Sequence, residues 1–164
     1  MLRTSSYKNN YFSVEVVEAD STADGSFSNL ILLTRSAVPF ASFAEIDAGC
    51  IPVQLHLDRI GRKGKRILVD TRDAVGNNDP AFEKRFDAHR MRMVQGFEAV
   101  AILVRTPVGR LQNQRLAEKV PAAVAPRPPV DTPPHIRVFM SWDDALAHLQ
   151  TYEAEPSSNS KRSR

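Results

Sequence analysis

Three arginines in this sequence stand where guanidinium groups could bind an anion. Arg72 comes just after the apolar run 67–69, Arg105 comes just after the run 100–104, and Arg110 follows soon after. Guanidinium groups form charge-assisted, bidentate hydrogen bonds with carboxylates and phosphates. If the two runs are neighbouring parallel strands, Arg72 and Arg105 lie at their carboxyl edge, where open α/β sheets bind ligands. The sequence therefore predicts a polar, arginine-containing turn face at that edge.

The turn after the first run contributes further polar groups to this face. Asn77 and Asn78 can donate and accept hydrogen bonds, and Asp79 begins a helix whose first N–H groups favour anions. The complete predicted face consists of Arg72, Asn77, Asn78, Asp79, Arg105 and Arg110. Our first interpretation is that this face binds the acidic groups of a partner protein. The alternative is a sensor that binds a small anionic or nucleotide ligand at the same sheet edge.

Three carboxylates in the same turns indicate a structural role for the arginines. Asp70, Asp73 and Asp79 can pair with the nearby guanidinium groups and so fix the turns, and we favour this interpretation over binding. Carboxylates also hold Mg²⁺ or catalyse hydrolysis in other proteins. However, Asp79 is needed to cap the following helix, and the arginines would compete with a cation. We therefore predict neither a metal site nor a catalytic pair.

The rest of the sequence gives no sign of enzyme chemistry. His56, His89, His135 and His148 lack metal-ligand spacing, and His89, on an apolar stripe, is interpreted as a residue at the edge of the core. The sequence contains 7 glycines, none arranged as a phosphate-binding loop. Cys50 is the single cysteine and lies among apolar residues, so we expect an inert buried thiol and no intrachain disulfide. We predict a non-enzymatic protein without a cofactor.

The composition is that of one soluble globular domain. The chain has 164 residues, of which 42% are hydrophobic and 25% are charged. The net charge of +3 is modest, and the basic clusters at 62–66 and 161–164 lack interleaved aromatic residues, so a nucleic-acid partner is not expected. The cluster at 62–66 is interpreted as a solvated turn. No apolar stretch approaches the ~20 residues that span a bilayer, and no signal peptide is evident, so we expect a cytoplasmic protein.

Apolar runs predict the strands. The polar residues 1–10 are expected to be a flexible N-terminus. The following strands are expected at 11–18, 29–34, 67–69, 99–104 and 136–139, with the first two forming a hairpin. The single domain is expected to cover residues 11–152, with a proline-rich loop insert at 121–134 and a disordered basic tail at 153–164.

Helix-starting patterns occur between these strands at Ser42, Asp79, Thr106 and Ser141. Prolines follow directly after Asp79 and Thr106, in the position where the missing N–H costs nothing. Pro52 lies inside the first helix, which should run to Gly61, and is expected to kink or divide it. That helix is expected to bury Phe43, Ile46, Leu57 and Ile60. The helix that begins at Asp79 is expected to bury Phe82, Phe86, His89 and Met93. The helix that begins at Thr106 should run to about residue 119.

Three segments of the chain resemble a group of small bacterial STAS-like proteins, which are similar to the domain of anti-sigma factor antagonists. They are Leu68-Val69-Asp70-x-Arg72-x-Ala74-x-Gly76-x-Asn78-Asp79-Pro80-x-Phe82-Glu83, then Val104-Arg105-Thr106-x-x-Gly109-Arg110-Leu111-Gln112-x-x-Arg115, and the closing Arg137-Val138-Phe139 with its helix. The resemblance spans roughly residues 11–149.

This resemblance implies a regulatory module and a mixed sheet of about five strands flanked by about four helices, in agreement with the order of elements above. Anti-sigma factor antagonists carry a phosphorylatable serine at the turn into a helix, and Asn78-Asp79 stands at that place here. A serine kinase cannot phosphorylate an aspartate. The phosphorylation switch that the resemblance implies is therefore not expected in this chain.

Overall fold

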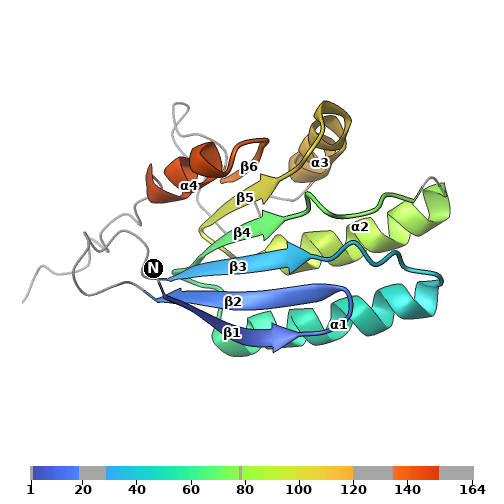
Figure 1. The fold of residues 1–164 in the computed structure, drawn as a ribbon, viewed down its shortest axis with the longest axis horizontal. Helices are drawn as coiled ribbons and strands as arrows, with labels where there is room; N and C mark the ends of the chain where they lie inside the picture. Colours follow the sequence, from blue (N-terminus) through green and yellow to red (C-terminus); the bar gives the residue numbers. More distant parts are fainter. Residues whose placement is uncertain (1, 19–28, 78, 120–134, 152–164) are drawn as a thin grey trace, which may run out of the picture.

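The computed structural model describes residues 2–18, 29–77, 79–119 and 135–151. These residues form an α/β fold with a six-stranded mixed sheet and four helices, as predicted in class (Figure 1). The strands are β1 Leu2–Lys8, β2 Phe12–Glu18, β3 Leu30–Arg35, β4 Arg66–Asp70, β5 Ala99–Leu103 and β6 Ile136–Phe139. The helices are α1 Phe43–Ile60, α2 Pro80–Val94, α3 Pro107–Lys119 and α4 Trp142–Thr151.

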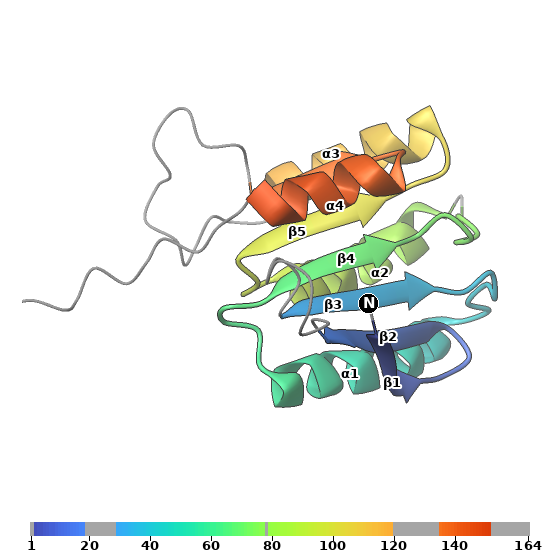
Figure 2. The same ribbon diagram turned by 60° about the vertical axis from the view of Figure 1, so that its left-hand side comes forward.

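The strands are arranged in the sheet in the same order as in the chain. β1, β2 and β3 pair antiparallel, whereas β3 to β6 pair parallel. Helices α1, α2 and α3 pack on one face of the sheet, while α4 packs on the other face, so α4 and α2 lie on opposite sides in Figure 2. The carboxyl ends of β3, β4 and β5 therefore meet along one edge, as the sequence predicts.

Both faces of the central strands are covered, which explains their continuous apolar sequence. All five residues of β5 are buried. Val100 and Ile102 face the larger core beneath α1 to α3, whereas Ala101 and Leu103 face the smaller core beneath α4. Burial of these side chains supplies the main favourable free energy of the fold.

The predicted flexible N-terminus at 1–10 is wrong, because residues 2–8 form the edge strand β1. Tyr7 packs against the larger core, and its ring stacks on His56 at 5.3 Å. An edge strand needs few apolar residues, so its sequence does not show the alternation typical of a half-buried strand. The turn at 19–28, Asn78, the proline-rich insert at 121–134 and the tail at 153–164 lie outside the described residues.

The predicted caps are confirmed at all four helices. Ser42 Oγ accepts from the backbone N–H of Glu45 at 3.2 Å, and Asp79 Oδ1 accepts from Ala81 at 2.8 Å. Thr106 Oγ1 accepts from the N–H of Gly109 at 3.1 Å, and Ser141 Oγ accepts from that of Asp144 at 3.3 Å. These contacts satisfy amide groups that the helices themselves leave unpaired.

The structure corrects two expectations about α1, namely that Pro52 could divide the helix and that Phe43 is buried. Pro52 does not divide the helix, which continues from Phe43 to Ile60 because Ile46, Val53 and Leu57 bury the same face before and after it. Phe43 is 49% exposed, and its ring lies 5.5 Å from that of Phe82.

The basic cluster at 62–66 is not simply a solvated turn. Arg62 Nη1 donates to the backbone carbonyls of Arg92, Met93 and Gln95 at 2.5–3.0 Å, so it caps the carboxyl end of α2. Lys65 Nζ donates to the carbonyl of Ile60 at 2.9 Å and caps α1 in the same way. Both cations lie at the negative end of a helix dipole. No helix in the described parts of the chain is long and apolar enough to cross a membrane.

Candidate functional site

A cavity of about 480 Å³ opens at the carboxyl ends of β3, β4 and β5, on the face covered by α1 to α3. Its apolar walls come from the sheet, the 39–40 segment and α2: Phe12, Leu33, Phe40, Val69, Phe82, Phe86, Met93, Ile102 and Val104. Its polar lining includes Arg35, Arg72, Asp73, Asn77, Glu83, Arg90, Arg105, Gln112 and Asn113. A mostly apolar hollow with a few polar groups is typical of sites for small ligands.

The structure brings together half of the predicted face. Arg72, Asn77 and Arg105 line the cavity. Asp79 is exposed and serves as the cap of α2, and Asn78 lies outside the described residues.

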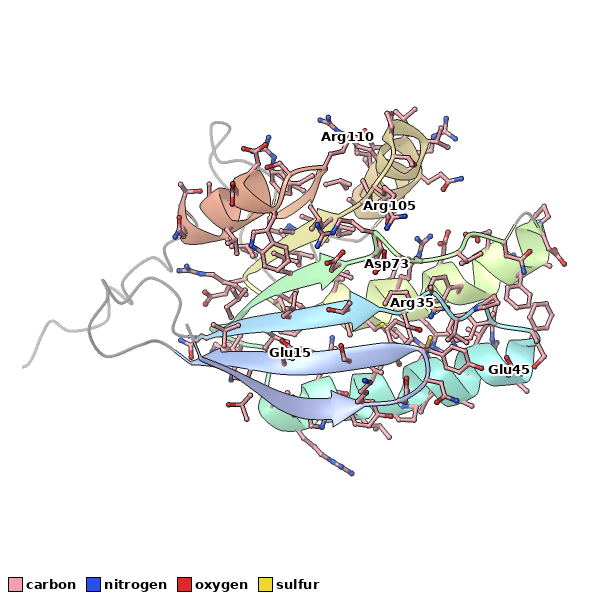
Figure 3. The ribbon with its side chains drawn as sticks, viewed as in Figure 1. Glu15, Arg35, Glu45, Asp73, Arg105 and Arg110 are labelled. Atoms are coloured by element: carbon pink, nitrogen blue, oxygen red, sulfur yellow. The ribbon has the colours of Figure 1, made fainter. Side chains whose placement is uncertain are left out.

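Arg110 does not join this face, and that part of the prediction is wrong. It lines a separate groove beside β6 with His135 and Arg137, and Figure 3 shows it apart from Arg105. The reason is helical phase: Gly109 and Gln112 line the cavity, and a residue one step after Gly109 is rotated by about 100°.

The rim arginines pair with Asp70 and Asp73, which confirms the interpretation we favoured for these two carboxylates, whereas Asp79 caps α2. Arg72 donates from Nε and Nη2 to the two oxygens of Asp70 at 3.0 and 2.7 Å, and this bond raises the pKa of Arg72. Arg105 Nη2 donates to Asp73 Oδ1 at 2.5 Å (Figure 3). Each arginine at the cavity mouth is therefore largely neutralised. Within the described ranges, no three histidine, cysteine, aspartate or glutamate side chains come together as metal ligands.

Arg35, which the sequence did not indicate, is the deepest cation of the cavity. Only 3% of the residue is exposed. Its guanidinium donates to the backbone carbonyls of Tyr11, Ser36 and Val38 at 2.7–3.1 Å. Burial lowers its pKa from the usual value. In the part of the chain that the structure describes, no carboxylate forms an ion pair with it.

Three aromatic rings surround the Arg35 guanidinium. Its Cζ lies 4.3 Å from the ring centre of Phe40, 5.2 Å from that of Phe12 and 5.4 Å from that of Tyr11. Cation–π attraction and backbone carbonyls thus replace the missing carboxylate. Among the residues with a described position, no negative charge stands beside the positive charge of Arg35.

Arg90 and Asn113 form a second polar group in the wall. Arg90 lies on α2 and pairs with Asp87, while its Nη1 donates to Asn113 Oδ1 at 3.4 Å. Asn113 is 7% exposed, and its Nδ2 donates to the carbonyl of Gly109 at 2.9 Å. The guanidinium carbon of Arg90 lies 5.2 Å from the ring centre of Phe86. The spacing of Phe86 and Arg90, one helical turn apart, is the only signal in the sequence for this contact.

Outside the cavity, His89 is buried between α1 and α2, as expected for the edge of the core. Gln54 Nε2 lies 2.8 Å from His89 Nδ1, and His89 Nε2 lies 2.8 Å from Asp47 Oδ1. Because the amide nitrogen is a donor, Nδ1 accepts and Nε2 carries the proton that Asp47 accepts. Both ring nitrogens are engaged, so His89 is not placed to act as a general base.

Cys50 is also buried outside the cavity. Its burial raises the pKa of the thiol to about 12, as expected for an inert cysteine.

Asp47→Asn is expected to destabilise the protein at pH 7 and to have little effect near pH 2. Hydrogen bonds from Arg85, and then from His89, lower the pKa of Asp47 to about 2. A lowered pKa contributes stability above the unfolded value of about 4, and this contribution is lost as the pH falls through the folded value. Urea unfolding of the unsubstituted protein and of Asp47→Asn between pH 7 and pH 2 measures the difference in their free energies of unfolding. A difference that stays constant over this range would contradict the prediction.

Comparisons with known proteins gave no match among family models, curated proteins or solved structures. The resemblance to STAS-like proteins therefore stays a prediction.

Proposed function

We propose that this protein is a non-enzymatic sensor that binds a small, largely apolar ligand with an acidic group. The observation that carries the proposal is the cavity at the carboxyl edge of β3 to β5, with aromatic walls and the buried Arg35, which pairs with no carboxylate of the described residues. Apolar walls supply affinity by removing ligand surface from water, and a few polar groups fix its orientation.

Binding is favoured over catalysis because the hydroxyl groups and the carboxylate of the lining that could serve as nucleophile or base are already engaged with the protein. Thr71 Oγ1 donates to the carbonyl of Leu103 at 2.9 Å, and Thr106 Oγ1 accepts from the N–H of Gly109. Asp73 is paired with Arg105. A nucleophile needs an adjacent base to activate it, and none of the lining residues described here forms such a pair.

A ligand that fills the cavity is expected to raise the melting temperature of the full chain, because binding to the native state alone stabilises it by mass action. Thermal-shift screening of small organic acids measures this effect. Gln112→Trp, at an exposed lining position of α3, should abolish the shift by filling the cavity mouth. Leu111→Trp is the matched control, since Leu111 is 60% exposed and is not part of the lining. The proposal fails if no compound binds, or if Gln112→Trp binds as well as Leu111→Trp.

A protein partner that covers the cavity mouth is the second candidate. It is supported by Val75 and Val108, which line the mouth and are 55% and 65% exposed. Exposed apolar side chains grouped at one place often mark an interaction surface. The two candidates are distinguished by purification of the tagged chain, because a protein partner co-purifies whereas a small ligand stabilises the isolated chain.

A further inference from the structure

Helix α1 has a second apolar face, which points away from the core. Its inner face is buried and includes Ile46, Cys50, Val53 and Leu57. The opposite side carries four exposed apolar residues, which we call the outer seam: Ala44, Ala48, Ile51 and Leu55. The two large residues of the outer seam are 44% and 53% exposed. A surface helix normally turns polar side chains outward, and a helix that is apolar all round is normally buried. The outer seam therefore indicates a surface that another element covers.

Both flanks of the outer seam are engaged with the rest of the fold. On the side of α2, Asp47 accepts two hydrogen bonds from Arg85 at 3.0 and 2.6 Å. On the side of β1, the ring of His56 stacks on that of Tyr7. Helices α1, α2 and α3 lie side by side in one layer, and within the described ranges no second layer covers α1 (Figure 2). No residue of α1 lines the cavity, so the outer seam is separate from the proposed ligand site.

The spacing of the outer seam is that of a contact between two helices. Its residues follow one another at intervals of four, three and four positions. These are the intervals between the a and d positions of a coiled coil, where side chains of one helix insert between those of another. The occupant of the outer seam is therefore expected to be an α-helix.

The order of small and large residues selects a second copy of α1 as that helix. In a symmetric contact, residue i of each copy meets residue j of the other. In an antiparallel pair, Ala48 then faces Ile51 of the second copy, and Ala44 faces Leu55 of the second copy. Each large side chain lies against an alanine, so the helices can approach closely without leaving gaps. A parallel pair would instead place alanine against alanine and leucine against leucine.

The charges along α1 fit the same antiparallel pair. The negative carboxyl end of each helix lies beside the positive amino end of the other. Asp58, whose side chain is 60% exposed, continues the line of the outer seam by a further step of three. It reaches the first turn of the second copy's helix, whose N–H groups favour a carboxylate. On one flank Asp47 comes opposite Gln54 of the second copy. On the other flank Glu45 comes opposite Pro52, so carboxylates do not meet.

We propose that this protein forms a weak symmetric homodimer through the outer seam, with the two α1 helices antiparallel about a two-fold axis between Ala48 and Ile51. The inference goes beyond the proposed function and does not depend on it. One helix pair buries less than the roughly 800 Å² per partner of a standard interface, so the expected dissociation constant is about 10 to 100 µM. At about 1 µM the protein is a monomer, and unfolding experiments at that concentration report the monomer.

Sedimentation velocity of the full chain from about 1 to 500 µM tests the association. The expected result is a monomer at the lowest concentration and a dimer at the highest, without larger species, because a two-fold contact closes on itself. Ile51→Glu places a carboxylate in the outer seam and should weaken dimerisation by about 100-fold. Leu111→Glu is the matched control, since Leu111 is a 60% exposed apolar residue of α3, and it should dimerise like the unsubstituted protein.

Circular dichroism checks that both variants are folded. A dimer that folded Ile51→Glu forms as well as Leu111→Glu would overturn the proposal, because the contact would then lie elsewhere on the molecule. A chain that stays monomeric at every concentration would also overturn it and would leave the outer seam to a helix of another protein. The proposed ligand site shares no residue with the outer seam, so neither result would affect the proposed function.

Disulfide trapping tests the direction of the two helices. Ala44→Cys and Leu55→Cys are prepared separately, mixed and oxidised, and mass spectrometry distinguishes the three possible dimers. The antiparallel pair brings these two positions within disulfide distance, so the mixed dimer should exceed the dimer of either variant with itself by about fivefold. The native Cys50 is buried and is not expected to react. Cross-linking of each variant mainly to itself, or without preference, would overturn the antiparallel arrangement.

Discussion

Arg35→Ala is expected to lower the free energy of unfolding by about 3 to 4 kcal/mol. The substitution removes the donor shared by the carbonyls of Tyr11, Ser36 and Val38, which hold the end of β3 against the start of β2. It also removes the side chain around which the rings of Phe12 and Phe40 pack. Urea unfolding at pH 7 measures the change.

Two further variants separate the causes of this loss. Arg35→Lys retains the charge and most of the apolar stem, but an ammonium cannot reach three carbonyls with a planar fork, so an intermediate loss is expected. Arg59→Ala removes an exposed arginine of α1 and should change stability by less than about 0.5 kcal/mol. If Arg35→Ala is no more harmful than Arg59→Ala, Arg35 does not hold the two strands together.

The sequence contained enough information for the parallel strands and the helix starts, because both depend on neighbouring residues. Asp79-Pro80 and Thr106-Pro107 are local patterns, and the structure caps α2 and α3 at these residues. β1 was missed because an edge strand is held by backbone pairing with β2, and pairing leaves no apolar pattern in the sequence.

The candidate site was only half predictable, since it depends on contacts between distant residues. Arg72 and Arg105 follow strands that pair in parallel, and their place at one edge could be inferred from the chain. The direction of Arg110 depends on how α3 is rotated against the sheet. Arg35 binds the carbonyl of Tyr11, 24 residues earlier, and no local pattern marks a buried arginine that lacks a carboxylate partner.

Gly49→Val is expected to lower the free energy of unfolding by about 2 to 3 kcal/mol, because added side-chain atoms overpack the contact of α1 with the rings of Tyr11 and Phe40. A Cβ atom at Gly49 would lie 2.7 Å from Cδ2 of Tyr11 and 2.9 Å from Cε1 of Phe40. Neither ring is free to move, since the Tyr11 hydroxyl donates to Glu45 at 2.8 Å and Phe40 packs on Arg35. Urea unfolding of the variant measures the loss.

Ala48→Val is the matched control, because Ala48 is the exposed neighbour of Gly49 on α1 and reports the helix propensity of valine alone. The stability of Gly49→Ala should fall between those of Gly49→Val and Ala48→Val, since alanine gains about 1 kcal/mol of helix propensity over glycine while still meeting both rings.

Substitution of Gly49 should also change the cavity, because Phe40 is part of its wall and supports Arg35. Folded Gly49→Ala is therefore expected to bind an acid ligand more weakly than Ala48→Val. If it binds equally well, the ring positions set by α1 do not determine the shape of the site.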